Sequence, residues 1–520
     1  MGIIGRMQNK TWFSGSCLAL ACSLALTMVL GLASCGRTLE RESSTPTASA
    51  TPASAPVPAF DLCDPYRHEP AMQPAAKVDL GSVDYAACYH IQLRVVMDPQ
   101  PRLEVVQHTH YLNRLGKSLD ALVFRLWSNV PGEEPNVRFG RVTAFGVEAS
   151  HGLESQGTAL VVALDHALQP DEAADVVLEY SVQVPVGQPR GYGTFNYQDG
   201  ILLLSNVYAM VAVHDEDGWN MDVGPNYGDA TYSEIGLFSV DVTIPVTATL
   251  VTSGQTIDQK DNGDGTVTWT CVSGPMRDFM IASSANLEKA SATVGQIAVN
   301  SYYRPEHRET GEAVLGYARD AIRAYQQAFG VYPYYEFDVL EAPIPGGMEF
   351  PGLVLLGSDS YRQSGESLEF LVAHEVAHQW WYGLVGNDQV NKPWLDESLT
   401  NYSTFYYYDH VYGRDRAELA FRTYVAGPYE AALQRGRDAV VNQPVAAFDP
   451  QDYGPIVYGK GALFFYHVRE QLGYDLMLEA LRAYLQRNMY GVVTQDDLLA
   501  VLGGISGENL SELYEKWILG

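Results

Sequence analysis

The stretch of sequence that decides the fold is ESLEFLVAHEVAHQWWYG at residues 366–383, followed by WLDESLTNY at residues 394–402. The first segment is predicted to be a helix, and it contains His374 and His378. Histidines four residues apart lie one turn apart on the same helical face, so both imidazoles can reach one metal ion. Glu375 is rotated by about 100° from His374, which predicts a carboxylate beside the metal rather than on it.

The second segment supplies the expected third ligand, Glu397. The 18 residues between His378 and Glu397 let the first helix end, a glycine-containing loop turn, and a second helix bring the carboxylate back. Two imidazoles, one carboxylate and one position left for water are typical of catalytic zinc. We therefore expect one Zn2+ per chain, held by His374, His378 and Glu397. The alternative is a helix with two polar histidines, but such a motif arises by chance roughly once per hundred chains of this size.

The sequence around these two segments predicts a mixed second half. Strand, helix, strand and strand are expected in turn at residues 294–303, 309–329, 337–343 and 351–358. Beyond residue 366 the pattern is mainly helical. We expect one α+β domain over residues 287–520 that becomes all-helical toward its end.

The preceding part of the chain, residues 78–286, is predicted to be rich in β-structure. Its apolar runs alternate with polar residues and are separated by Gly, Pro and Asp clusters. Six strands are expected, at residues 88–98, 103–113, 121–127, 174–184, 238–246 and 265–272. An antiparallel sandwich or saddle of sheets fits this pattern best.

Two features of this β-rich part resemble sites but have simpler explanations. Asp261–Gly265 reads DNGDG, which is similar to part of a calcium loop but lacks the later glutamate, so a hairpin turn is favoured. His108 and His110 share one strand face, yet no third ligand accompanies them, so we interpret them as part of a polar sheet face.

The first 34 residues have the pattern of an export signal. Arg6 and Lys10 precede a continuously small or apolar run at residues 17–34. The run ends Leu32-Ala33-Ser34-Cys35, which resembles the lipobox of bacterial lipoproteins. That resemblance implies a lipidated Cys35 and an exported protein anchored to a membrane, facing outside the cytoplasm. An uncleaved single-span anchor and plain secretion are the alternatives.

A tether and three further cysteines follow the signal. Residues 35–77 are expected to form a flexible tether, because the segment up to residue 59 is rich in Ser, Thr, Pro and Ala and cannot form a core. Export makes a disulfide possible, and Cys63–Cys88 would fasten the segment after the tether to the first strand. Cys271 would then be left over as a small buried residue.

Composition excludes several classes of function. Hydrophobic residues make up 47% of the 520 residues, so the chain can build cores, and its length predicts two to four domains. Only one apolar run approaches the length needed to cross a membrane, which excludes a polytopic membrane protein. The net charge of −29 repels phosphate backbones, so we expect no nucleic-acid partner.

The zinc motif and its surroundings resemble the gluzincin metallopeptidases of the aminopeptidase N and leukotriene hydrolase family. HEVAH followed after 18 residues by Glu in WLDES is similar to that family's zinc motif. Gly346-Gly347-Met348-Glu349 is similar to its G-x-M-E-N exopeptidase motif, and Tyr458 in YGKGALFFY to its active-site tyrosine. The resemblance implies a β-rich N-terminal domain followed by a thermolysin-like, mainly helical zinc peptidase domain. It further implies removal of N-terminal residues from peptide substrates.

The resemblance also implies a role for each residue. Glu375 takes a proton from the attacking water and passes it to the leaving amine. Tyr458 donates a hydrogen bond to the oxyanion, with a packed interface tyrosine as the alternative. Glu349 pairs with the free α-ammonium of the substrate, although alone it could be a surface carboxylate. Backbone groups of Gly346, Gly347 and Met348 could pair with the substrate as an added strand.

Two departures from the family pattern leave other functions open. Phe350 stands where the family motif has Asn, and the N-terminal-domain residue that helps the family's glutamate bind the amine is not recognisable in residues 202–224. The chain also stops where many relatives continue into a further helical domain, so the active-site cleft could be more open. A zinc endopeptidase on the same fold is therefore the first alternative. A surface-tethered binding protein with an inert peptidase domain is the second, although every zinc and base residue is present.

Overall fold

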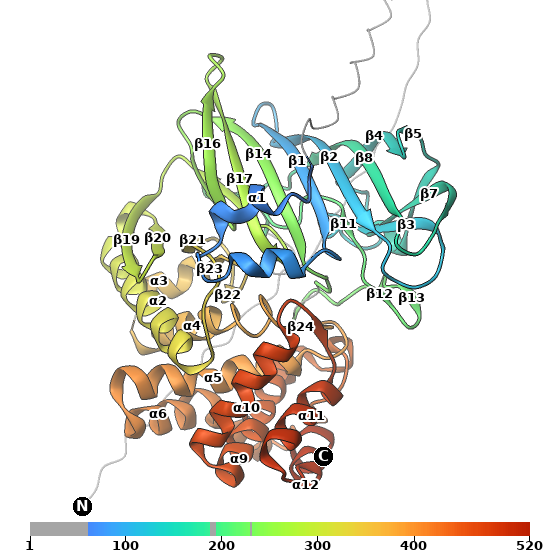
Figure 1. The fold of residues 1–520 in the computed structure, drawn as a ribbon. Coiled ribbons are helices and arrows are strands. Elements are labelled where there is room, and N and C mark those ends of the chain that lie inside the picture. The colour runs from blue at the N-terminus through green and yellow to red at the C-terminus, as the bar shows by residue number, and fades with distance from the viewer. Residues whose placement is uncertain (1–60, 188–193, 229–230, 364) are drawn as a thin grey trace, which may run out of the picture. The chain divides into compact units, whose positions relative to one another are not determined.

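The β-rich half and the helix-rich half occupy different parts of the molecule (Figure 1). This computed structural model describes residues 61–187, 194–228, 231–363 and 365–520. The expected signal, Cys35 and most of the expected tether lie outside these residues. Within them, a multi-sheet β domain is followed by a mainly helical domain, which confirms the predicted fold class.

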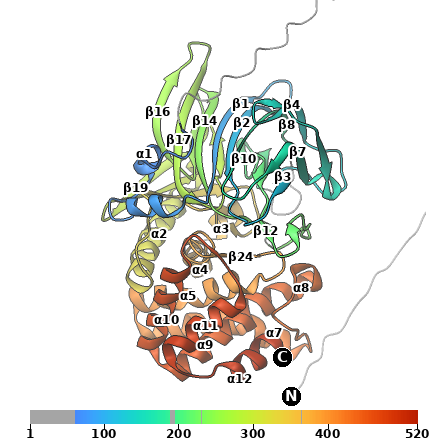
Figure 2. The same cartoon turned by 45° about the vertical axis from the view of Figure 1, so that its right-hand side comes forward.

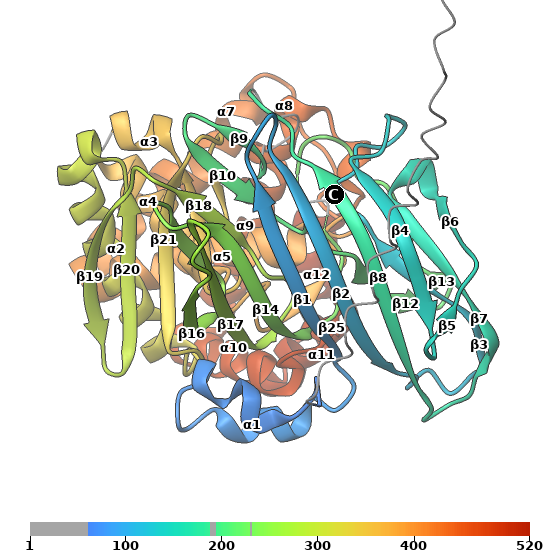
Figure 3. The ribbon, with the colours of Figure 1, turned by 90° about the horizontal axis from the view of Figure 1, so that it is seen from above.

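An eight-stranded sheet forms the largest layer of the β domain, and Figure 3 shows its long strands side by side. The strand order is β16 (Gln255–Asp261), β17 (Thr266–Met276), β14 (Gly236–Pro245), β1 (Ala87–Val96), β2 (Arg102–Leu112), β8 (Ala173–Gln183), β4 (Val137–Ala144) and β5 (Val147–Glu148). All neighbours are antiparallel except β1 and β14, which pair in parallel. The expected antiparallel sheet thus contains one parallel pair. Residue alternation specifies which face of a strand is buried and leaves its direction open.

Two four-stranded sheets complete the β domain. One has the order β15 (Thr249–Thr252), β18 (Ile281–Ser284), β10 (Ile201–Leu204) and β9 (Phe195–Gln198). The other has the order β11 (Met210–Val211), β3 (Leu119–Arg125), β7 (Ala159–Leu168) and β6 (His151–Glu154), and β12 (His214–Asp215) pairs with β13 (Gly218–Trp219). All six predicted strands are present. The additional ones are mostly short, so the sequence contains little alternation by which to recognise them.

The expected hairpin turn is present, and His108 and His110 lie on strand β2. Residues 261–265 connect β16 to β17 as a hairpin, in which the amide of Gly263 donates to Asp261 Oδ1 at 2.8 Å. His110 pairs with Asp175 at 2.8 Å, whereas the ring of His108 stacks at 6.1 Å from that of His90. The two histidines therefore make separate contacts on the sheet.

The segment before β1 is folded onto the body. It contains α1 (Pro65–His68), η1 (Glu69–Ala71) and η2 (Lys77–Ser82), and a disulfide joins Cys63 to Cys88 as expected. Folded structure thus begins before the tether boundary expected at residue 77. Cys271 is free and buried, also as expected.

A five-stranded sheet opens the second half. Its order is β19 (Glu288–Val294), β20 (Ile297–Tyr303), β21 (Glu336–Ala342), β23 (Leu353–Gly357) and β22 (Gly347–Met348), and α2 (Arg308–Ala328) packs beside β19 and β20. β20, β21 and β23 are parallel, whereas β22 runs antiparallel to β23 at the edge of the sheet. This edge faces the helix that contains His374, because α4 (Glu366–Ala377) contacts both β22 and β23.

Helices make up the rest of the chain (Figure 2). They are α3 (Ser358–Gln363), α4 (Glu366–Ala377), α5 (Trp394–Tyr412), α6 (Arg414–Ala420), α7 (Gly427–Gln434), α8 (Pro450–Tyr453), α9 (Gly461–Leu472), α10 (Tyr474–Asn488), α11 (Gln495–Ser506) and α12 (Ser511–Tyr514). β24 (Gly386–Asn387) pairs with β25 (Val492–Val493) and ties the loop after α4 to the C-terminal helices. Trp380, Trp381 and Trp394 are fully buried at the ends of α4 and α5. Trp381 Nε1 donates to Ser403 Oγ of α5 at 2.8 Å and so joins the end of α4 to α5. Among the described residues, none of the helices has the length and apolar character needed to cross a membrane.

Candidate metal centre

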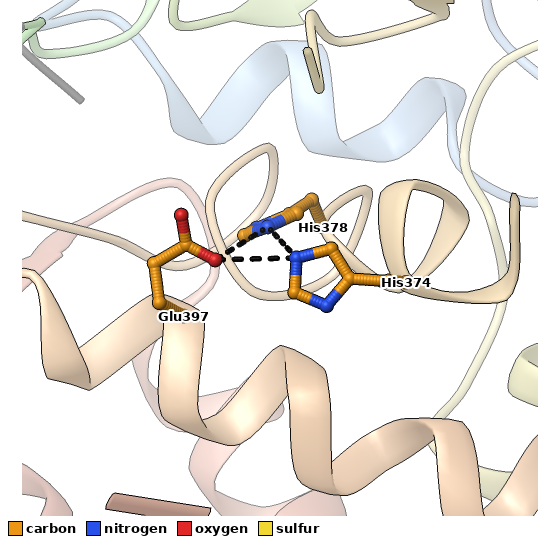
Figure 4. A group of neighbouring side chains, drawn as sticks. All are labelled: His374, His378 and Glu397. Carbon is orange, nitrogen blue, oxygen red and sulfur yellow. Dashed lines mark hydrogen bonds and ion pairs between the residues drawn. The ribbon is translucent and has the colours of Figure 1, made fainter. Parts of the chain in front are cut away.

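Two helices bring three ligand atoms to one point (Figure 4). His374 lies in the last turn of α4, His378 caps that helix, and Glu397 lies in the first turn of α5. Nε2 of His374 and Nε2 of His378 are 3.1 Å apart, and each lies 3.2 Å from Oε2 of Glu397. The structure therefore brings together the three ligands predicted from the sequence spacing.

The geometry and chemistry of these atoms fit a zinc ion. Tetrahedral bonds of about 2.0–2.1 Å place neighbouring ligand atoms roughly 3.3–3.4 Å apart, close to the separations found here. Glu397 Oε2 is buried and accepts no hydrogen bond, so a buried anionic oxygen is left for a cation. Burial lowers the pKa of His374, which favours the neutral imidazole that binds metals.

A second layer of contacts orients His378. Its Nδ1 lies 3.0 Å from the carbonyl oxygen of Trp381 and 3.2 Å from the hydroxyl of Thr400. Because the Trp381 carbonyl can only accept, Nδ1 carries the proton and Nε2 presents its lone pair to the other two ligands.

Glu375 lies beside the three ligands, as its position on the helix predicts. It is buried, and a Cβ added at Gly347 would lie 2.1 Å from its Oε1 atom. Glycine at 347 thus lets the edge strand β22 approach the carboxylate closely. Burial and the neighbouring charge of Glu349 raise the pKa of Glu375 well above its ordinary value. A raised pKa suits a carboxyl group that must hold and release a proton near neutral pH.

Tyr458 reaches the same point from the C-terminal helices. It lies in a π-helical segment, η7 (Gly454–Lys460), and its ring stacks on that of His374 with the centroids 5.5 Å apart. Its hydroxyl donates to Glu397 Oε1, and Asn401 Nδ2 donates to its carbonyl oxygen at 2.8 Å. The structure therefore places Tyr458 at the metal centre rather than in a remote packing position.

Glu349 follows the edge strand and is buried, so it is not a surface carboxylate. One of its carboxylate oxygens, a ring nitrogen of His378 and an oxygen of Asp396 all lie within 4.8 Å of one another. Gly346 precedes it at a φ of +64°, and its carbonyl accepts from the amide of Gly357 at 2.7 Å. The turn that glycine permits at 346 therefore directs Glu349 toward the metal ligands.

The backbone after Glu349 is held by the residue that follows the second histidine. Gln379 Nε2 donates to the carbonyl oxygen of Phe350 at 3.2 Å, and Gln379 Oε1 accepts from the amide of Gly352 at 2.8 Å. Phe350 itself packs in an apolar cluster with Leu203 of the β domain. The phenylalanine that departs from the family motif thus serves as an apolar contact between the two halves.

No pattern in the sequence points to Asp278 as a neighbour of Glu349. Asp278, between β17 and β18, is buried, accepts a hydrogen bond from Tyr382 and interacts electrostatically with Glu349. Burial raises the pKa of Asp278 to about 7, and the charge of Glu349 adds to the shift. Asp278 lies outside residues 202–224, the segment that corresponds best to the family's amine-binding stretch. A carboxylate inside the apolar run MRDFMIA at residues 276–282 is the signal that could have found it.

Comparisons with known proteins relate the helix-rich part of the chain to a family of peptidases. Residues 314–517 match the peptidase family M1 domain. Aminopeptidase N of Lactobacillus delbrueckii subsp. lactis is 30% identical over 222 residues, which cover 39% of this chain and 26% of that protein. Aminopeptidase 2 of Candida albicans is 26% identical over 240 residues, which cover 43% of this chain and 25% of that protein. The matched part thus spans about a quarter of the length of these curated relatives.

Solved structures show the same arrangement of domains. The M1 zinc metallopeptidase of Deinococcus radiodurans matches with a TM-score of 0.61 at 20% identity, over 83% of this chain and 93% of that one. A mutant of the same protein, bound to a Tyr-Ser-Ala substrate, matches with a TM-score of 0.60 at 19% identity. The described chain therefore has the fold of the M1 zinc metallopeptidases, and residues 314–517 match the M1 family domain.

Proposed function

We propose that this chain, with the M1 domain at residues 314–517, is a zinc-dependent aminopeptidase that removes N-terminal residues from peptides. One observation supports it above all. The edge strand β22 delivers the buried carboxylate of Glu349 to within 4.8 Å of an imidazole nitrogen of His378. A carboxylate at this position can pair with a free α-ammonium group next to the bond that is hydrolysed.

His374, His378 and Glu397 hold the zinc ion in this proposal. When bound, zinc supplies Lewis acidity toward the peptide carbonyl and lowers the pKa of water at the site. Glu375 accepts the proton of the attacking water and then donates it to the leaving amine.

Two further groups of the chain orient the substrate and stabilise charge. Tyr458 donates its hydroxyl hydrogen to the oxyanion that develops from the carbonyl oxygen. The outer edge of β22 has no partner strand among the described residues, so its backbone can pair with an extended peptide. In that position the substrate's first residue lies beside Glu349, which limits cleavage to the first peptide bond.

Blocking the substrate's amine decides between an aminopeptidase and the alternative endopeptidase. We expect zinc-loaded protein to hydrolyse aminoacyl-coumarin amides and to lose this activity when the amine is acetylated. An endopeptidase would keep its activity on acetylated peptides. The inert binding protein predicts no hydrolysis of either substrate and no effect of a chelator.

We also propose that the protein is exported and anchored to a membrane through a lipidated Cys35. The basic and apolar pattern of residues 1–34 and the lipobox-like residues before Cys35 support this location. The disulfide between Cys63 and Cys88 is consistent with it, because such bonds persist mainly outside the reducing cytosol. Cys35→Ser should move the protein from the membrane fraction to the soluble fraction, and unchanged pelleting would favour a hydrophobic anchor.

A further inference from the structure

A side-chain amide joins Glu349 to the helix that carries the third metal ligand. Gln389 lies in the loop between α4 and α5 and is buried. Its Nε2 group donates to Glu349 Oε1 at 3.3 Å and to Asp396 Oδ2 at 2.7 Å. Asp396 immediately precedes Glu397 and also accepts from Asn387 Nδ2 at 3.2 Å. A short chain of hydrogen bonds therefore fixes Glu349 relative to α5.

Glu349 needs such a donor because its other charged neighbours are mostly acidic. Asp278, Glu375, Asp396 and Glu397 are acidic residues that all lie close enough to interact with it. Acidic groups packed this closely need a hydrogen-bond donor where water is excluded, and the Gln389 amide supplies one between Glu349 and Asp396. Without a donor, the Glu349 side chain would be driven toward another rotamer. Gln389 supplies two N–H groups and carries no charge, so it holds two carboxylates without neutralising either.

We propose that Gln389 is a positioning residue that holds the Glu349 carboxylate where it meets the α-ammonium of the substrate. This inference rests on the proposed aminopeptidase function. It adds that a residue in the loop between α4 and α5 determines how accurately Glu349 is placed to bind the amine. Gln379 fixes the backbone after Glu349, whereas Gln389 fixes its side chain. The amine site and the metal site therefore share one rigid element, and a change at Gln389 alters recognition of the amine while leaving the zinc ligands in place.

Binding measured without turnover tests this directly. In zinc-loaded protein carrying Glu375→Gln, calorimetry would compare a Leu-Gly-Gly peptide with its N-acetylated form. We expect the free-amine peptide to bind more tightly. Gln389→Met, which keeps the length and removes the donor, should reduce that preference about 10-fold, the order expected when one hydrogen bond to a charged group is lost. Gln389→Glu should reduce it as well, because it adds another carboxylate.

A double-mutant comparison separates positioning from general damage. Glu349→Ala should remove the preference for the free amine, and adding Gln389→Met to it should cause no further loss, because Gln389 acts through Glu349. Gln107→Met is the matched control, since Gln107 is another buried glutamine that makes its hydrogen bonds inside the β domain. We expect that control to lower thermal stability and to leave the preference unchanged.

The outcomes distinguish failure of this inference from failure of the proposed function. No preference for the free amine in the Glu375→Gln protein itself would overturn the aminopeptidase assignment. A clear preference that both Gln389 variants leave within twofold would overturn only the role of Gln389. If Gln389→Met does not fold, Gln389→Glu carries the test, because it is almost identical in shape.

Discussion

The metal centre and the amine anchor are neighbours, but the chain builds them in different ways. All three metal ligands lie within residues 374–397, on two helices whose ends are fixed by buried tryptophans. Glu349 interacts with Gln389, which lies 40 residues further along the chain, and with Asp278 of the β domain, while Gln379 holds the backbone that follows it. The metal centre is therefore specified by local helix geometry, whereas the anchor depends on contacts between several parts of the chain. Changes in the metal centre should abolish peptide hydrolysis, and changes around Glu349 should alter the preference for substrates with a free amine.

Removing a metal ligand should give the largest effect. His378→Ala leaves two ligands for the ion, so we expect loss of zinc together with loss of detectable peptidase activity. Metal analysis of the purified variant and an aminoacyl-coumarin assay measure both. His410→Ala, at the exposed end of α5, should leave both unchanged. Full activity in a zinc-free His378→Ala protein would show that the metal ligands on α4 and α5 are not needed for peptide hydrolysis.

Glu375→Gln should reduce kcat while the zinc content stays at one ion per chain. General acid–base catalysis contributes roughly 10²–10⁴-fold, and the amide cannot accept the proton. Loss of activity with zinc retained would thus distinguish the general base Glu375 from the metal ligands His374 and His378 on the same helix. Activity equal to that of the unmodified protein would refute the role of Glu375.

Tyr458→Phe should lower kcat by roughly 10²–10³-fold, the usual cost of losing one oxyanion donor, with little change in KM. The ring can still stack on His374, so the fold should be retained. A rise in KM at unchanged kcat would instead indicate that the hydroxyl contacts the substrate only in the ground state.

Glu349→Ala should act on selectivity rather than on the metal. Losing a charge-assisted hydrogen bond to the ammonium should weaken kcat/KM for free-amine substrates about 10- to 100-fold. The residual rate on acetylated peptides should hardly change, because these substrates have no ammonium group for Glu349 to bind, and zinc should remain bound. Equal losses on both kinds of peptide would remove the amine role and show that the anchor and the metal centre are not separable.

Asp278→Asn should give the smallest and most conditional effect, a gain in stability that depends on pH. Burial raises the pKa of Asp278 to about 7 in the folded chain. Between about pH 4 and pH 7 the unfolded chain releases this proton while the folded chain keeps it, so the free energy of unfolding falls as pH rises. The asparagine side chain of the variant does not titrate, so the free energy of unfolding of the variant should not fall in this way. In urea unfolding, the variant should therefore exceed the unmodified protein in stability by an amount that grows from pH 5 to pH 7.5. A difference that is constant with pH would contradict the buried, protonated state.

The same contrast explains what the sequence could predict. Helix periodicity converts the spacing of His374, His378 and Glu397 into geometry, so these ligands could be named from the sequence alone. No pattern of that kind connects Asp278 or Gln389 with Glu349, because they meet only through tertiary packing. Likewise, alternation identified the long strands of the β domain but could not specify that β1 and β14 pair in parallel. The pairing of Cys63 with Cys88 was expected, since few other partners remained.

Diffraction data collected on both sides of the zinc absorption edge would locate the ion itself. We expect one anomalous peak per chain, coordinated by Nε2 of His374, Nε2 of His378 and the carboxylate of Glu397. A zinc peak held by other residues, or none in zinc-soaked crystals with these three side chains in place, would contradict it.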